Sequence, residues 1–244
     1  VDIISDVNMA YSEHARRYLA DCGLPKERTY VTGSPMAEVL HNNLAEIEAS
    51  DVHRRLCLEK GKYILLSAHR EENIDTEKNF LSLFNAINKM AERYDMPILY
   101  SCHPRSRNRL ATSGFELDSR VIQHEPLGFH DYNCLQMNAF AVVSDSGTLP
   151  EESSFFTSIG YPFPAICIRT STERPEAIDK GGFIIAGIDE RSLLQAVDTA
   201  VELCRNAQYG IPVPDYVDEN VSTKVVKIVQ SYVSIVNKMV WRKF

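Results

Sequence analysis

The sequence lacks the patterns that would assign it to several common classes of protein. Its six cysteines are scattered, with no CxxC pair and no dense cluster, which argues against both a zinc site and a disulfide-bonded scaffold. Cys102 and His103 are adjacent, but no second pair stands at zinc spacing, so we expect no metal. No GxGxxG motif follows the first strand expected in the main domain, and we expect no dinucleotide or other cofactor.

Net positive charge and long apolar runs are absent as well. The net charge of −7 argues against a protein whose affinity comes from neutralising nucleic-acid phosphates. No apolar stretch approaches the ~20 residues that a membrane helix requires. Together with the scattered cysteines, these absences predict a cytoplasmic protein that binds neither nucleic acid nor a membrane. An apolar fraction of 44% and a charged fraction of 24% are ordinary for a globular protein.

The first fifty residues contain two strand-and-helix units without the rest of a sheet. An apolar run at 3–10 precedes a helical pattern at 12–22, and a short strand at 29–32 precedes another helical stretch. Parallel strands need neighbouring strands and helices over both faces, so this segment cannot form a domain alone. We expect residues 1–50 to be the tail of an N-terminal domain and residues 51–61 to be a linker.

Residues 62–218 show strands that alternate with helices, which predicts an α/β domain with a doubly wound, Rossmann-like parallel sheet. The expected strands are 63–66, 97–101, 121–122, 141–144 and 165–168, and the longer expected helices are 77–94, 132–138, 150–158 and 190–206. The last segment, 219–244, contains an amphipathic helix expected over 225–240. Ser222 is the residue type that caps such a helix.

The segment Asp145-Ser146-Gly147-Thr148 joins an apolar strand to the start of a helix. Small residues there allow a ligand to approach the backbone, and the unpaired N–H groups and dipole of the helix favour an anion such as phosphate. Glu152, one turn into the helix, is able to accept two hydrogen bonds from a ribose diol. These features indicate a nucleotide site. A capping box between Thr148 and Glu151 is the purely structural alternative.

Three further motifs follow the same order as in a known family. The pattern Asp-Ser-Gly-x-x-x-Glu-Glu at 145–152 is followed by x-Gly-x-Pro at 159–162 and Arg-x-x-Thr-Glu-Arg-Pro-Glu at 169–176, and a His-Arg-x-Glu-Asn loop lies at 69–73. The chain resembles the C-terminal portion of the non-hydrolysing UDP-N-acetylglucosamine 2-epimerases, whose fold is that of GT-B glycosyltransferases. The segments 103–105, 153–156 and 161–164 resemble the branch that forms UDP-N-acetyl-L-fucosamine from a UDP-2-acetamido-2,6-dideoxy-L-talose. Thr148 departs from the family, which commonly has a second glycine there.

The resemblance implies a reaction in which UDP is eliminated across C1–C2 of the sugar and then re-added. It implies that Ser146 and the backbone of Gly147 bind the diphosphate, that Glu152 binds the ribose hydroxyls, and that Tyr132 lies near the uracil. The expected product serves capsule or O-antigen polysaccharide synthesis.

The catalytic candidates are His69 and Arg174, whose nitrogen atoms are suited to support the diphosphate leaving group. Arg174 could equally form a structural ion pair with Glu176. Lesser candidates for binding, for which structural roles remain equally open, are Arg70, Glu72, His103 and Arg169.

The carboxylates that this family uses for proton transfer at C2 belong to its N-terminal domain, upstream of the residues present here. We therefore expect an inactive UDP-binding half whose last helix returns towards the missing domain, and a homodimer when the enzyme is complete. Two alternatives remain: a GT-B glycosyltransferase, and a non-catalytic module that binds a UDP-sugar.

Overall fold

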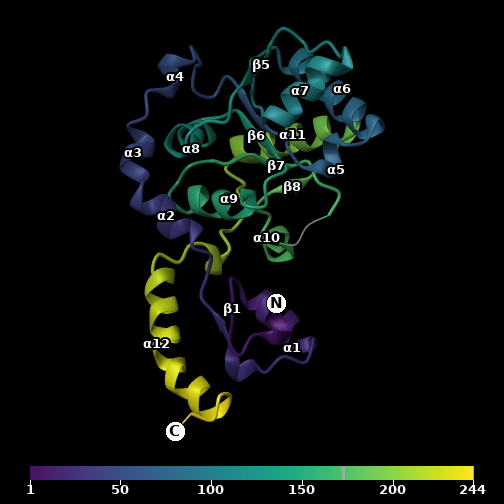
Figure 1. The fold of residues 1–244 in the computed structure, drawn as a ribbon. Helices are drawn as coiled ribbons and strands as arrows, with labels where there is room; N and C mark the ends of the chain where they lie inside the picture. The colour runs from purple at the N-terminus through teal and green to yellow at the C-terminus, as the bar shows by residue number, and fades with distance from the viewer. Residues whose placement is uncertain (172–173, 244) are drawn as a thin grey trace. The chain divides into compact units, whose positions relative to one another are not determined.

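The computed structural model describes residues 1–171 and 174–243, and it divides into two compact units. One unit comprises residues 43–212, and the other comprises residues 1–42 together with 213–244 (Figure 1). Within the described part of the chain, no helix is both long and apolar enough to cross a bilayer.

The larger unit is built on a six-stranded parallel sheet in the order β5-β4-β3-β6-β7-β8. The strands are β3 (Ile64–Ser67), β4 (Ile98–Ser101), β5 (Val121–His124), β6 (Ala141–Ser144), β7 (Ala165–Cys167) and β8 (Ile184–Ile185). The first strand of the unit, β3, lies in the middle and pairs with β4 on one side and β6 on the other. The expected α/β fold with a doubly wound parallel sheet is confirmed.

Helices cover both faces of this sheet. The helices of the unit are α3 (Leu44–Glu48), α4 (Val52–Arg55), α5 (Glu71–Ile74), α6 (Glu77–Tyr94), α7 (Pro104–Ser113), α8 (Phe129–Met137), α9 (Leu149–Ser158), α10 (Pro175–Asp179) and α11 (Glu190–Arg205). Buried side chains of α6 and α11 pack with alternate strand residues such as Ile64 and Val143 in one apolar core. Helices α8 and α9 lie on the other side of the sheet (Figure 1). The strand residues on that side of the sheet, such as Leu65 and Val142, are fully buried.

Residues 43–61 belong to the larger unit, although we expected them to be the end of the N-terminal tail and a linker. Two side chains of this segment bind Asp131 on α8: the Ser50 hydroxyl donates to it at 2.6 Å, and Arg55 pairs with it at 2.5 Å. Ile47 and Val52 are fully buried. Short helices with one polar face resemble a linker in sequence. Only their packing on α8 shows that these residues are part of the larger unit.

The smaller unit combines both ends of the chain. It contains the parallel pair β1 (Asn8–Ala10) and β2 (Thr29–Val31), the helices α1 (Glu13–Asp21), α2 (Met36–Asn42) and α12 (Val221–Met239), and the short 3-10 turns η1 (Asp2–Ile4), η2 (Lys26–Arg28) and η3 (Pro214–Tyr216). The hydroxyl groups of Tyr30 on β2 and Tyr232 on α12 lie 2.7 Å apart. The final helix therefore packs with the N-terminal strands through a contact that links opposite ends of the sequence.

The start of α12 differs from the expected one. The helix begins at Val221, and its N-cap is Asn220, which makes no capping hydrogen bond with its side chain. Ser222 does not cap the helix. Instead, its backbone N–H donates to the Glu38 carboxylate at 2.9 Å, and its hydroxyl donates to the same carboxylate. The Glu38 carboxylate on α2 thus takes the role at the start of α12 that the sequence predicted for the Ser222 side chain.

Candidate functional site

The predicted motifs converge where the strand order of the larger unit reverses. The loops that follow β3, β6 and β7 begin with Ala68, Asp145 and Ile168, with His69 directly after Ala68, and these three strands are neighbours in the sheet. In an open parallel sheet, ligands bind at this reversal, beyond the carboxyl ends of the strands. The sequence placed the motifs after strands, and the strand order brings them together.

Asp145 is the centre of this region. It is fully buried, and its Oδ2 atom accepts hydrogen bonds from the backbone N–H groups of His69 and Arg70 at 2.9 Å and from Asn73 Nδ2 at 3.1 Å. Arg70 Nε donates to the Asp145 carbonyl at 2.8 Å, and Asn73 Nδ2 also donates to the Ile168 carbonyl at 3.0 Å. One carboxylate and one amide therefore hold the loops after β3, β6 and β7 together.

Asp145 and Asn73 are both part of the sequence motifs, but the sequence alone assigns no role to either residue. The one property that marks them in the sequence is a polar side chain within a loop that follows a strand. Their actual contacts are with the backbone and with each other, and such contacts depend on the strand order.

An open hollow of about 590 Å³ lies beside these loops and is lined by His69, Arg70, Glu72, His103 and Arg105. The His69 side chain is 47% exposed, and its Nδ1 atom lies 3.1 Å from Asp145 Oδ1. His103 is the N-cap of α7, where its Nδ1 atom accepts from the backbone N–H of Arg105 at 3.3 Å. Four of the five lining side chains are basic or imidazole groups, a composition that favours an anionic ligand.

The turn that precedes α9 holds a chain of hydroxyl groups. Ser146 Oγ lies 2.8 Å from Thr148 Oγ1, and the Thr148 hydroxyl donates to Glu152 Oε1 at 2.9 Å. Thr148 is the N-cap of α9 but makes no capping hydrogen bond with its side chain. The capping box considered as the structural alternative is therefore not formed. Ser146 and Glu152 are connected through Thr148, while Gly147 forms the turn between them.

Glu152 is 8% exposed, and burial raises its pKa to about 7. The neighbouring Glu151 raises it further, whereas hydrogen bonds from Thr148 and Gln136 lower it in part. Tyr132 on α8 is half-buried, and burial followed by the charge of Glu152 raises the pKa of its phenol. The structure thus places Glu152, the predicted ribose acceptor, close enough to Tyr132, the predicted uracil neighbour, for its charge to affect the phenol.

The two arginines after β7 bind carboxylates. Arg174 Nη2 lies 3.3 Å from Oε1 of Glu151, whose side chain is 3% exposed, so α9 provides an acidic partner for this arginine. Arg169 Nε lies 3.6 Å from Glu72 Oε1. Two further motif residues, 172 and 173, lie outside the described residues. Arg174 is therefore attached to the same helix that carries Glu152.

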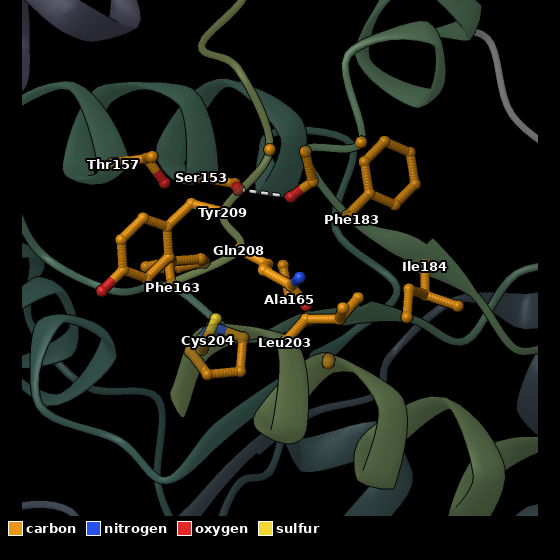
Figure 2. Close-up of a pocket in the computed structure, with 15 residues that line it drawn as sticks. Ser153, Thr157, Phe163, Ala165, Phe183, Ile184, Leu203, Cys204, Gln208 and Tyr209 are labelled. Carbon is orange, nitrogen blue, oxygen red and sulfur yellow. Dashed lines mark hydrogen bonds between the residues drawn. The ribbon is translucent and has the colours of Figure 1, made fainter. Parts of the chain in front are cut away.

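A second cavity, of about 50 Å³, lies between α9, β7 and α11 (Figure 2). The Ser153 hydroxyl lies at the edge of this cavity and donates a hydrogen bond to the Gly182 carbonyl at 2.5 Å. Ligand sites for molecules of nucleotide size have volumes of roughly 300–1,000 Å³. This cavity is too small for such a ligand. Among the described residues, no group of three or more His, Cys, Asp or Glu side chains is arranged to hold a metal ion.

Comparisons with known proteins agree on one family. The family model described as UDP-N-acetylglucosamine 2-epimerase matches residues 1–230. A structure of UDP-N-acetylglucosamine 2-epimerase from Rickettsia bellii has 40% identity and a TM-score of 0.88, and the match covers 99% of this chain and 64% of that one. The Methanocaldococcus jannaschii UDP-GlcNAc 2-epimerase, solved with UDP-GlcNAc and UDP, has 26% identity and a TM-score of 0.81, with coverage of 94% and 62%.

A curated relative gives the same result from sequence. The UDP-N-acetylglucosamine 2-epimerase of Methanocaldococcus jannaschii is 28% identical over 212 residues, which is 84% of this chain and 57% of the relative. The chain therefore spans little more than half the length of the curated relatives that it matches.

Proposed function

This chain belongs to the UDP-N-acetylglucosamine 2-epimerase family, and from that premise we propose that it is the UDP-binding half of a UDP-N-acetylamino-sugar 2-epimerase. The observation that carries the proposal is the arrangement at the start of α9. A chain of hydroxyl groups connects Ser146, in an anion-binding turn, to Glu152, an acceptor suited to a diol. A ribose and its diphosphate present these two chemical groups side by side.

The reaction requires a diphosphate to leave C1 and to be retained until it returns. The hydrogen on C2 is not next to a carbonyl, so its direct removal is unfavourable and elimination of UDP to a glycal is the more accessible route. In this proposal, the N–H groups of the α9 turn and Ser146 hold the diphosphate, and Arg174 adds positive charge. His69, when both of its ring nitrogens are protonated, donates a hydrogen bond to the leaving group from the adjacent hollow.

Proton transfer at C2 needs carboxylates that the family resemblance assigns to a preceding domain. The smaller unit, 1–42 with 213–244, is in this proposal the part of that domain present here. Its helix α12 supports this, since Val226, Val229, Val233 and Met239 are 48–72% exposed. A soluble protein rarely leaves such a face uncovered, so we propose that the remainder of the N-terminal domain packs on it. The complete enzyme is proposed to be a homodimer.

For the substrate, we propose UDP-2-acetamido-2,6-dideoxy-L-talose and its product UDP-N-acetyl-L-fucosamine, used in capsule or O-antigen synthesis. The segments typical of this branch are 103–105, 153–156 and 161–164. His103 and Arg105 line the hollow. The other two segments pack together, with Phe156 stacked on Phe163 at a distance of 5.4 Å between ring centroids. The sugar itself has to be identified by assay.

The proposal is tested by calorimetry with UDP and by an isotope experiment. UDP should bind to this chain, and Glu152→Ala should weaken binding by roughly 1–3 kcal/mol, the scale of hydrogen bonds to a charged group. Equal affinity in parent and variant would remove the ribose assignment.

The enzyme extended by its N-terminal domain should form product with deuterium at C2 in deuterium oxide, with either UDP-N-acetylglucosamine or the L-talose compound as substrate. A glycosyltransferase would leave C2 unlabelled. A module that only binds UDP-sugars would give no product even with the domain restored.

A further inference from the structure

The two oxygen atoms of the buried Asp145 carboxylate have very different surroundings. Oδ2 receives three hydrogen bonds, from two backbone N–H groups and from Asn73 Nδ2. Oδ1 has no hydrogen-bond partner among the residues that the structure describes, yet His69 Nδ1 lies 3.1 Å from it. A buried carboxylate oxygen without a donor is costly, and a proton on the adjacent His69 Nδ1 lessens that cost.

We propose that Asp145 is a positioning residue that keeps the proton of His69 on Nδ1 and leaves Nε2 as the ring atom that faces ligand. The Nδ1 position cannot lose its proton without placing two acceptors against each other at 3.1 Å, one of them on the fully buried Asp145 side chain. Any proton that the ring gains or gives up is therefore exchanged at Nε2. The link to a bound diphosphate rests on the proposed function, but the tautomer does not.

The second imidazole of the same hollow has the opposite arrangement. His103 Nδ1 accepts a hydrogen bond from the backbone N–H of Arg105, so in the neutral ring the proton is on Nε2. Neutral His69 thus offers the ligand an acceptor at Nε2, and neutral His103 offers a donor. When His69 takes a second proton, its Nε2 also becomes a donor.

The same geometry determines what an Asp145→Asn substitution does. The three N–H donors around Oδ2 require an oxygen there, so the amide oxygen of the asparagine must occupy that position. The NH₂ group is then turned towards His69 Nδ1. Because this group only donates, Nδ1 must become an acceptor, and the neutral ring must move its proton to Nε2.

The test is long-range ¹H–¹⁵N correlation of the histidine side chains in the ¹⁵N-labelled chain, recorded at a pH where the rings are neutral. We expect a protonated Nδ1 for His69 in the parent and a protonated Nε2 in Asp145→Asn. His103 should show a protonated Nε2 in both. Asn73→Ala is the matched control, since it removes one donor from Oδ2 but leaves the carboxylate facing the ring, and His69 should keep its tautomer.

A parent spectrum with His69 protonated on Nε2 would overturn the inference, and this measurement stands even if Asp145→Asn fails to fold. An unchanged tautomer in a folded Asp145→Asn protein would overturn it as well.

Addition of UDP to the parent distinguishes this inference from the proposed function. The Nε2 resonance of His69 should shift while Nδ1 remains protonated. Failure of UDP to bind contradicts the proposed function alone, whereas UDP binding with the wrong tautomer contradicts only the role of Asp145.

Discussion

Replacement of Glu152 by glutamine should make the unliganded protein more stable at alkaline pH and at the same time weaken UDP binding. Burial raises the pKa of this carboxyl from 4.5 to about 7, with Glu151 adding to the effect. A carboxyl whose pKa is raised in the folded state favours folding only when it is protonated. The charge of Glu152 is therefore a cost to stability that the proposed ribose contact requires.

The sign and the pH range follow from this difference in pKa. Below pH 4.5 both the folded and unfolded states hold the proton, so Glu152 contributes nothing. As pH rises towards 7, the folded protein keeps a proton that the unfolded chain releases, and the free energy of unfolding falls. The difference between 4.5 and about 7, at about 1.4 kcal/mol per pH unit, amounts to about 3 kcal/mol, reached above pH 7.

The assay is urea denaturation of the parent and Glu152→Gln at two values, one below pH 4.5 and one above pH 7. Glutamine is isosteric and keeps an acceptor for the Thr148 hydroxyl, so the variants should be nearly equal in acid. At alkaline pH, Glu152→Gln should be more stable by up to about 3 kcal/mol. Glu46→Gln, at an exposed position on α3, is the matched control and should show no such difference.

Calorimetry on the same proteins should show UDP binding weakened by roughly 10–100-fold in Glu152→Gln at alkaline pH, because the amide is a weaker acceptor for the diol. The phosphate groups of UDP also titrate. Because Glu152→Gln has no carboxyl group at this position, the pH dependence of UDP binding to the variant shows the contribution of the phosphate groups without that of Glu152. A variant that is less stable than the parent at alkaline pH, or that shows the same stability difference at both pH values, would refute the reasoning.

Three other substitutions test neighbouring parts of the structure. Thr148→Val removes a hydrogen bond that lowers the pKa of Glu152, so UDP affinity at neutral pH should fall by about 1 kcal/mol in calorimetry; Thr148→Ser should restore it. Arg174→Ala takes a cation from the buried carboxylate of Glu151, and urea denaturation should show a loss of about 2 kcal/mol, with less loss in Arg174→Lys. Phe84→Ala should cost about 3–5 kcal/mol in the same assay, since this ring is fully buried in the core shared by α6 and α11, and an unchanged midpoint would contradict that packing.

Much of the larger unit could be predicted from local pattern. Helix α6 occupies 77–94 as expected, and strand β6 occupies 141–144. Apolar periodicity and the switch between strand and helix patterns are properties of consecutive residues, so one sequence is sufficient to detect them. The turn before α9, which we propose to bind an anion, could be located for the same reason, because a strand, small residues and a helix start follow one another in the chain.

Contacts between distant segments could not be predicted in this way. Ser222 has the right residue type for an N-cap, yet the N–H groups at the start of α12 are bound by Glu38, 184 positions away in sequence. Residues 51–61 have the length and polarity of a linker, and residues 43–50 follow the N-terminal tail in sequence, but both segments belong to the larger unit. In each case a partner far along the chain changed the outcome that local propensity favoured.

The sequence by itself determined the chemistry available to this protein: strands followed by turns that we propose to bind phosphate, one carboxylate suited to a diol, and two histidines near basic side chains. Tertiary structure decided which of these groups are coupled. The strand order places β3 beside β6, and only that neighbourhood gives His69 the buried carboxylate of Asp145 while His103 caps a helix instead. Residue type fixes which hydrogen bonds a side chain is able to donate or accept. Which ring nitrogen of a histidine carries the proton depends on the partner that lies about 3 Å away, and the fold alone supplies that partner.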